Sequence, residues 1–393
     1  MKLQPLKGIK VVDFSHAWAG PTCTALLSDA GADIIKIEPI AGDFLRPSRS
    51  IFVNVNRNKR SIALNLKTGE GRHITLRLLE SADVLVENFV PGVMSRLGLG
   101  YKAISVLNPR IIYCSISGFG QEGPYHKRPA FDPVAQAVSG IMLITGESDR
   151  PPVRIFPPMI DYSAGLHAAY GIMIALLNRE ATGKGERIDI SLMDIGIVHM
   201  NAAVTKYSVT GELPMRTGSA GMGWAPYQAF ETSDGWVMIG VATNEMWQRL
   251  CKVLKLEDLR NNPRYATTES RAKHQKELAE ILTRVTQQYK AIELESMLSE
   301  AGVPSGQLRN IGEAVEDPHV KARHLIDDVE YPGMGKIKMV KTPIFFSGQA
   351  PSVRSQAPQL GEHTDEVLTE LGYSEADIQR LEDSGVVRRN GQP

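Results

Sequence analysis

Short apolar runs alternate with helix-forming stretches at the start of the chain, and this alternation restricts the possible folds most. Ile9–Phe14 is an apolar run that ends in a turn, as expected for a buried strand of a parallel sheet. Pro21 then opens a helix that Gly31 closes, and Asp33–Glu38 supplies the next strand. Strand, helix and strand in this order form the βαβ unit of doubly wound sheets.

The alternation continues over the following residues, which predicts an α/β domain with a mostly parallel sheet. Its further expected elements are strand Ser61–Leu64, helix Gly69–Leu79, strand Asp83–Glu87, helix Tyr101–Leu107 and strand Ile111–Ser115. Asp132-Pro133 is typical of a helix start, with Asp132 as the N-cap. One helix is then predicted for Leu192–Val209.

The second half of the chain has a different character. We expect a large domain over residues 1–210, a glycine-containing loop or linker over 211–225, and a smaller α+β domain over 226–335. That smaller domain includes a predicted helix over Arg271–Tyr289. Residues 336–393 are predicted to be a linker and C-terminal helices that return to the large domain.

Composition excludes several classes of function. Lys plus Arg equals Asp plus Glu at 44 each, so no net charge attracts the chain to nucleic acid or an anionic membrane. The three cysteines have no metal-like spacing and lie in apolar stretches, which indicates buried thiols in a reducing compartment. The N-terminus lacks the apolar run of a signal peptide, and the apolar helix near Ala168–Leu177 is too short for a membrane span. We therefore expect a cytoplasmic protein.

Familiar cofactor and catalytic motifs fail on context or are missing. Gly118–Gly123 matches G-x-G-x-x-G after a strand, but Pro124 and Tyr125 follow where a dinucleotide site needs a helix. A glycine-rich active-site loop is the better interpretation. The sequence has no P-loop, no Gly-x-Ser-x-Gly elbow and no His-Glu-x-x-His motif, so we expect neither a nucleotide-driven enzyme nor a metal site.

The turn after the first strand is a candidate ligand site, because α/β sheets bind ligands beyond the carboxyl ends of their strands. His16 lies in this turn, although an isolated histidine is more often structural, and Gly20 allows close backbone approach. A basic and amide-bearing set near strand ends would suit a phosphorylated adenine nucleotide, or each member is a surface charge. The set comprises Lys36, Arg57, Lys59, Arg60, Lys67, Asn88 and Arg96, with Phe89 among them.

A proline-punctuated loop, residues 151–160, delivers Asp161 to the start of a long apolar helix. On local sequence alone, an Asp at this position is most often an N-cap. The helix carries small residues, including Gly165 and Gly171, which predicts that another element packs closely against it.

Taken together, these segments resemble the class III coenzyme A transferases, the family of formyl-CoA and carnitine-CoA transferases that also contains 2-methylacyl-CoA racemases. The resemblance covers nearly the whole chain. It rests on His16-x-x-Ala19-Gly20-Pro21, Ile35–Glu38, Asn58–Ile62, Val86-Glu87-Asn88-Phe89-x-Pro91-Gly92, Ser117–Gly120, Gln136-Ala137-x-Ser139-Gly140, the Asp161 loop, Arg179-x-x-Thr182-Gly183-x-Gly185 and Leu360–Thr364.

The resemblance implies a Rossmann-like large domain, a small domain and an interlocked homodimer. It implies that Asp161 is a nucleophile that forms a mixed anhydride and then an aspartyl-CoA thioester, with acyl-CoA as substrate and no permanently bound cofactor. A helix start would also keep its carboxylate ionised. The implied supporting loop contains Gly218, Gly221 and Gly223. The implied CoA contacts are His16, Ala17, Ala19, Leu64, Lys67, Asn88, Phe89 and Arg96.

Departures from the family pattern narrow the expected reaction. Trp18 stands where formyl-CoA transferases carry Gln, which disfavours formate and oxalate chemistry. Phe131 stands where the racemases carry the His of a Gly-His-Asp motif, and a racemase needs two acid/base groups. A non-catalytic acyl-CoA-binding protein is the remaining alternative. Arg154 and Arg216 are candidates to pair with a distal substrate carboxylate, as in succinyl-CoA, or are surface charges.

Overall fold

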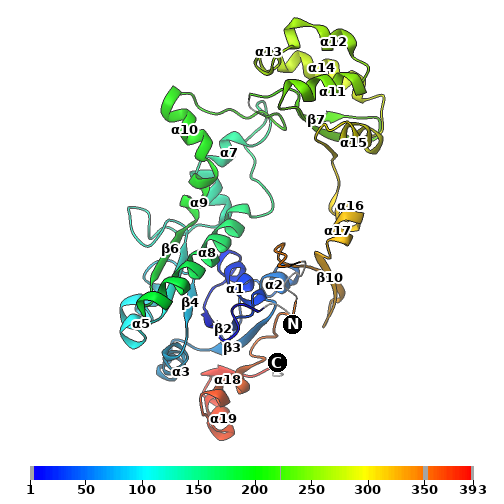
Figure 1. The fold of residues 1–393 in the computed structure, drawn as a ribbon. Helices are drawn as coiled ribbons and strands as arrows, with labels where there is room; N and C mark the ends of the chain where they lie inside the picture. The colour runs from blue at the N-terminus through cyan, green and yellow to red at the C-terminus, as the bar shows by residue number, and fades with distance from the viewer. Residues whose placement is uncertain (1–3, 222, 348–352, 391–393) are drawn as a thin grey trace. The chain divides into compact units, whose positions relative to one another are not determined.

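The computed structural model describes residues 4–221, 223–347 and 353–390, and these form two compact units (Figure 1). The large unit contains the described residues within 1–141, 154–210 and 321–393, and the small unit contains 142–153 and 211–320. These limits differ from the domains expected from sequence, because 142–153 pack with the small unit and 321–335 with the large one.

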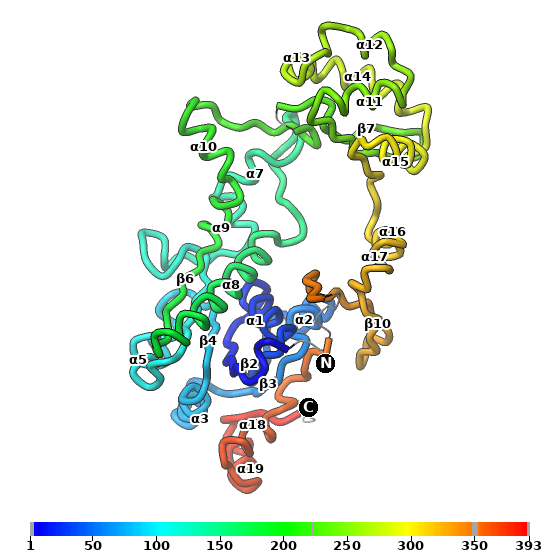
Figure 2. The backbone as a smooth tube through the Cα atoms, in the orientation of Figure 1, coloured from blue at the N-terminus to red at the C-terminus, as the bar shows by residue number. Residues whose placement is uncertain are grey.

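A seven-stranded sheet forms the centre of the large unit. Its strands are β1 (Lys10–Asp13), β2 (Asp33–Glu38), β3 (Lys59–Leu64), β4 (Val84–Glu87), β5 (Ile112–Ser117), β6 (Arg187–Ser191) and β12 (Val387–Arg388). They lie in the order β12-β3-β2-β1-β4-β5-β6, and all pairs are parallel except β12 with β3. The predicted α/β class with a mostly parallel sheet is confirmed. Figure 2 shows the C-terminal segment beside β3.

Successive side chains of each strand point to opposite faces of the sheet, and the side chains on both faces are apolar. Helices therefore cover both faces. Val11 belongs to a core with α1 and α8, whereas Val12 belongs to a core with α3, α5, α18 and α19. The helices with these and neighbouring positions are α1 (Ala19–Asp29), α2 (Arg49–Val55), α3 (Gly69–Glu80), α4 (Val93–Arg96), α5 (Tyr101–Leu107), α6 (Asp132–Val138), α8 (Met159–Thr182), α9 (Leu192–His199), α10 (Asn201–Thr210), α18 (Thr364–Glu370) and α19 (Glu375–Asp383). A polar antiparallel ribbon is formed by β10 (Ile326–Tyr331) with β11 (Gly335–Val340).

Helix α8 packs closely against α1, as its small residues predict. A Cβ atom on Gly165 would lie 2.6 Å from the carbonyl oxygen of Ala19 and 2.8 Å from Cβ of Thr22. The helix is 24 residues long, longer than expected, and passes a length and hydropathy test for a membrane span. Its buried face, which includes Ala164, Ala168 and Ile172, lies in the core of the large unit.

The small unit has a three-stranded antiparallel sheet with helices. The strands are β7 (Tyr227–Glu231), β8 (Trp236–Gly240) and β9 (Ser305–Gln307), and the core surrounds the fully buried Trp247. Its helices are α11 (Asn244–Val253), α12 (Glu257–Asn261), the short 3₁₀ turn Pro263–Tyr265, α13 (Thr268–Lys273), α14 (Gln275–Thr286), α15 (Ala291–Glu300) and α16 (Ile311–Glu316). Helices α7 (Ile141–Ile144) and α17 (Pro318–Ala322) each contain a boundary between the units.

Two predicted helices are each divided in the structure. The helix expected over Leu192–Val209 breaks at Met200 into α9 and α10, and that over Arg271–Tyr289 breaks at His274 into α13 and α14. Neither Met200 nor His274 is a Gly or Pro, so the sequence carries no breaker residue at either position.

Candidate active site

A cavity of about 250 Å³ lies beyond the carboxyl ends of β1, β4 and β5 in the large unit. This is the edge at which doubly wound sheets bind ligands. Its walls are apolar with a few polar groups, and one of these is Asp161. The lining residues are His16, Ala17, Ala19, Phe44, Asn88, Phe89, Val90, Ile116, Ser117, Gly118, Ala130, Phe131, Asp161 and Leu192.

Five of the eight predicted CoA contacts line this cavity together with Asp161. They are His16, Ala17, Ala19, Asn88 and Phe89. The other three lie elsewhere. Leu64 is buried in the core and its backbone pairs with Val387, whereas the side chains of Lys67 and Arg96 are exposed.

The turn that carries His16 is held by close backbone packing. Ala17 has a φ of 61°, and a Cβ on Gly20 would lie 2.2 Å from Cβ of Ser15. The side chain of Asn88 bridges to the backbone of His16, accepting from its N–H at 2.8 Å and donating to its carbonyl at 2.7 Å. The ends of β1 and β4 therefore fix this turn at the cavity.

Asp161 lies in the first turn of α8, but it is not the N-cap, because the cap position is Pro158. The N-cap interpretations of Asp161 and Asp132 are both wrong. Asp132 is the first residue of α6, and its Oδ2 accepts hydrogen bonds from the N–H groups of Ile160 and Asp161 at 2.8 and 3.1 Å. A carboxylate from one helix thus satisfies the free N–H groups at the start of another.

Gln136 also holds the start of α8 in place. The sequence identified it only as part of a segment of the family resemblance and did not indicate this role. Its Nε2 donates to Asp132, and its amide exchanges two hydrogen bonds with the backbone of Ile155, at 2.8 and 3.0 Å. The proline-punctuated loop is therefore attached to α6 just before it delivers Asp161. Asp132 and Gln136 are 4 residues apart, about one helical turn, and this spacing could have indicated that their side chains interact.

Burial and the negative charge of Asp132 raise the pKa of Asp161 to about 7. The expectation that the helix start keeps this carboxylate ionised is therefore wrong. Asp132 already occupies the N–H groups that would have stabilised the Asp161 carboxylate.

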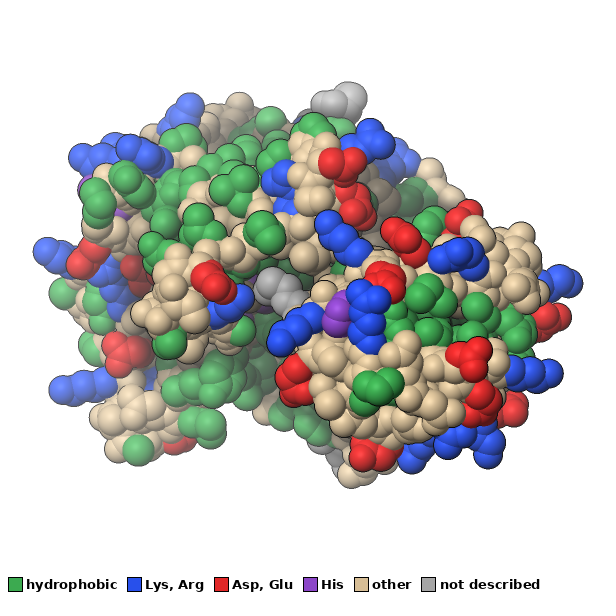
Figure 3. Space-filling model, turned by 90° about the horizontal axis from the view of Figure 1, so that it is seen from above, with side chains coloured by type: hydrophobic (Ala, Val, Ile, Leu, Met, Phe, Trp, Pro, Cys, Tyr) green, Lys and Arg blue, Asp and Glu red, His purple; other side chains and the backbone are tan. Residues whose placement is uncertain are grey.

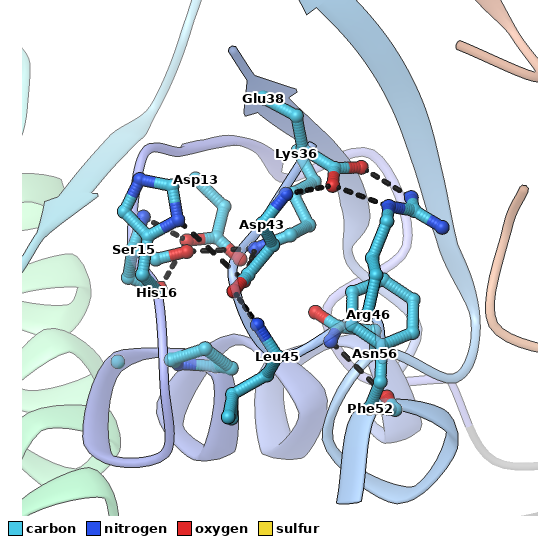
Figure 4. A network of polar contacts seen from close by, with 12 residues as sticks. Asp13, Ser15, His16, Lys36, Glu38, Asp43, Leu45, Arg46, Phe52 and Asn56 are labelled. Atoms are coloured by element: carbon cyan, nitrogen blue, oxygen red, sulfur yellow. Dashed lines mark hydrogen bonds and ion pairs between the residues drawn. The ribbon is translucent and has the colours of Figure 1, made fainter. Parts of the chain in front are cut away.

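A buried ionic network lies beside His16, one of the residues that line the cavity, and is shown in Figure 4. Lys36 lies 3.0 Å from Asp43, and Lys59 lies 3.0 Å from Asp13. Burial raises the pKa of Asp13, but the ammonium groups of Lys59 and Lys36 outweigh it and hold the pKa at about 2. Burial lowers the pKa of Lys59 to about 8.

Four members of the predicted basic set therefore have internal carboxylate partners. Lys36 and Lys59 belong to this network, Arg57 pairs with Asp29, and Arg60 pairs with Asp33, Glu366 and Glu370. Their convergence on a nucleotide is not supported. Within that set, Lys67 and Arg96 have exposed side chains.

The predicted glycine loop lies in the small unit. The N–H of Gly218 donates to Gly146 at 3.0 Å, and the N–H of Gly221 donates to Tyr227 at 2.7 Å. Gly218 and Gly223 have φ values of 63° and 87°, so glycine is suited to both positions. Arg216 donates to three nearby backbone carbonyls, of Glu147, Ser148 and Arg150.

Comparison with known proteins settles the family. The model for CoA-transferase family III matches residues 6–364. The chain belongs to this family. It is 37% identical to succinyl-CoA:glutarate CoA-transferase of Homo sapiens over 98% of this chain and 90% of the relative. It is 36% identical to succinyl-CoA–D-citramalate CoA-transferase of Chloroflexus aurantiacus over 98% of each chain.

A solved structure confirms the fold of this CoA-transferase family member. The CAIB/BAIF family protein from Brucella suis has a TM-score of 0.85 and 35% identity, with 94% of this chain and all of that chain covered.

Among the described residues, no group of three His, Cys, Asp or Glu side chains is placed to hold a metal ion. Figure 3 shows basic and acidic side chains interspersed on the visible face of the molecule.

Proposed function

We propose that this enzyme transfers CoA from an acyl-CoA thioester to a free carboxylic acid, with Asp161 as the nucleophile. The observation that carries this proposal is the presence of Asp161 in one cavity with five residues expected to contact CoA. A carboxylate in an apolar, partly closed site is a better nucleophile than one in water, because its hydration shell is reduced.

In the proposed sequence, a carboxylate oxygen of Asp161 attacks the thioester carbon of the donor. The C–S bond breaks, which gives a mixed anhydride and CoA thiolate. The thiolate attacks Cγ of Asp161, the donor acid leaves as a carboxylate, and an aspartyl-CoA thioester remains. The acceptor carboxylate then attacks Cγ and expels the thiolate, which attacks the acceptor carbonyl and regenerates Asp161.

Each tetrahedral intermediate needs hydrogen-bond donors for its oxyanion. The family resemblance implies that the loop with Gly218, Gly221 and Gly223 has this role, and we assign it to N–H groups of this loop other than those of Gly218 and Gly221, which donate to Gly146 and Tyr227. Both Gly218 and Gly223 adopt left-handed backbone conformations, which turn successive N–H groups in ways that other residues rarely allow.

We propose a small dicarboxylic acid such as succinate as the donor acid, in line with the names of both curated relatives. Arg154 is the better candidate for the distal carboxylate, because its guanidinium is exposed in the loop that leads to Asp161, whereas Arg216 is bonded to backbone carbonyls. Arg154→Gln should raise KM for succinyl-CoA about tenfold and leave KM for butyryl-CoA unchanged. Equal effects on both donors would contradict this role.

We further propose that the protein is a cytoplasmic homodimer. The outward face of α8 carries Tyr162, Leu166, Tyr170, Ile174 and Leu177, each between 43% and 71% exposed. Helix α10, which follows α9, has no buried residue in this chain alone. Apolar surface of this extent is typical of an interface.

The racemase alternative is not favoured. Phe131 lines the cavity where the racemases carry a histidine, and a phenyl ring cannot exchange a proton with an α-carbon. A non-catalytic binding protein is tested by the same experiment as the nucleophile.

Asp161→Ala should abolish CoA transfer while the circular dichroism spectrum and oligomeric state stay unchanged. Wild-type enzyme incubated with acyl-CoA and hydroxylamine should acquire a hydroxamate at Asp161, visible by mass spectrometry. Transfer by Asp161→Ala at a near wild-type rate, or modification only at another residue, would reject the assignment. Tyr162→Phe, which changes the adjacent residue conservatively, is the matched control.

A further inference from the structure

Among the described residues, a buried ring nitrogen of a residue that lines the cavity has no hydrogen-bond partner. This nitrogen is Nδ1 of His16, and it faces Oδ2 of Asp43 at 3.6 Å (Figure 4). A buried donor or acceptor without a partner is destabilising. Since a carboxylate accepts and a protonated ring nitrogen donates, each atom is the natural partner of the other.

Asp43 is itself held rigidly from two sides. Its Oδ1 accepts from the N–H of Leu45 at 2.9 Å, and its Oδ2 lies 3.0 Å from the ammonium group of Lys36. Lys36 is fully buried and also donates to the carbonyl of Ser15 at 2.7 Å. Burial opposes ionisation, but His16 and Lys36 hold the pKa of Asp43 well below its usual range, so its carboxylate is charged.

The imidazole of His16 is confined by its neighbours as well. Its ring lies 5.4 Å from the ring of Phe89 and 6.4 Å from that of Phe44, and its backbone is clamped by Asn88. In the described part of the chain, Nε2 makes no hydrogen bond, while the side chain lines the cavity that contains Asp161. Nε2 is therefore the nitrogen available to a ligand.

We propose that Asp43, fixed by Lys36, is a positioning residue that keeps the proton of neutral His16 on Nδ1 and thereby presents Nε2 to the cavity as a hydrogen-bond acceptor. The ligand group that matches an acceptor at this place is an amide N–H of the pantetheine arm of acyl-CoA. This inference rests on the proposed function for the identity of the ligand, but the tautomer of His16 does not depend on it.

The direct test is nitrogen NMR of selectively ¹⁵N-histidine-labelled protein at mildly alkaline pH, where free histidine is neutral. His16→Gln assigns the signal. Wild-type His16 should show a protonated Nδ1 and an unprotonated Nε2, and Asp43→Asn should shift the proton towards Nε2. A wild-type His16 protonated on Nε2 would overturn the proposal. This measurement on the wild-type protein does not require Asp43→Asn to fold.

Kinetics provide a second test. Asp43→Asn should lower kcat/KM for acyl-CoA about five- to tenfold, the effect of one hydrogen bond, and leave kcat/KM for the acceptor acid unchanged. In a His16→Ala background the same change should have no further effect, because Asp43 acts through His16. Asp29→Asn, which removes the buried partner of Arg57, is the control for a lost ion pair and should leave both constants unchanged.

The outcomes separate the two proposals. Additive effects of Asp43→Asn and His16→Ala would reject the positioning role even if CoA transfer is confirmed. Conversely, if the enzyme transfers no CoA, the proposed function fails while the NMR result still decides the tautomer.

Discussion

At the scale of single residues, the protonation of Asp161 controls the proposed reaction. Attack on a thioester needs the carboxylate form, and burial together with Asp132 raises the pKa of Asp161 to about 7. The kcat/KM for acyl-CoA should therefore fall as the pH decreases through 7, since this constant reports the free enzyme. A pH–rate profile of wild-type enzyme measures this decrease, the acidic limb of the profile, directly.

Asp132→Asn tests the cause of that shift. The amide keeps an oxygen that can accept from the start of α8, but it removes the negative charge that disfavours ionisation of Asp161. The acidic limb should move to lower pH, by a part of the total shift because burial remains. An unchanged or higher limb would contradict the electrostatic account. Glu180→Gln, which removes an exposed carboxylate near the other end of α8, is the matched charge control.

The family resemblance predicted Asp161 and all five cavity residues as site residues, whereas the local sequence indicated only the His16 turn and, within the basic set, Asn88 and Phe89. The local pattern predicted N-caps at Asp161 and Asp132, because it shows which helix is adjacent in sequence and not which helix is adjacent in space. Asp132 caps α8, 28 residues away, rather than its own helix. Lys36 and Lys59 were expected to be either nucleotide contacts or surface charges, and the structure shows buried ion pairs instead, because their carboxylate partners are distant in sequence.

At the scale of elements, the approach of α1 to α8 positions the helix that carries Asp161. Gly165→Val would place side-chain atoms where the Ala19 carbonyl and Thr22 lie, so we expect a loss of about 1–3 kcal/mol in unfolding free energy. Chemical denaturation measures this loss. Gly171→Ala is the control, because its nearest neighbour is a side-chain methyl of Ile188 at 3.4 Å and alanine favours a helix. Equal destabilisation by both changes would contradict the close contact.

Strands and most helices of the first 120 residues could be predicted because apolar runs and turn residues alternate there. The predicted Asp33–Glu38 strand and Tyr101–Leu107 helix match β2 and α5 at both ends. The two-residue strand β12 could not be predicted, since it exists only through its pairing with β3, more than 300 residues earlier. The three-residue β9 depends on β8 in the same way.

At the scale of the whole molecule, the chain adds β2 and β3 on one side of β1 and then β4, β5 and β6 on the other, so the strand order reverses between β1 and β4. This topology places the ends of β1 and β4 side by side, which brings His16 to Asn88 and both to Asp161. The fold therefore determines at which edge of the sheet the site lies. The strand order alone does not indicate which residues form the site.

The outward face of α8 supports the last prediction, which concerns assembly. A charged residue on this apolar face would be buried without a partner in a dimer, so Tyr170→Glu should weaken association strongly. The groove of about 270 Å³ beside it, between α1, α8 and residues 342–346, is almost wholly apolar and would be covered by the same contact. Size-exclusion chromatography with light scattering should show a dimer for wild-type protein and mainly monomer for Tyr170→Glu. Val106→Glu, on the exposed face of α5, should remain dimeric, and a monomeric wild type at micromolar concentration would reject the homodimer.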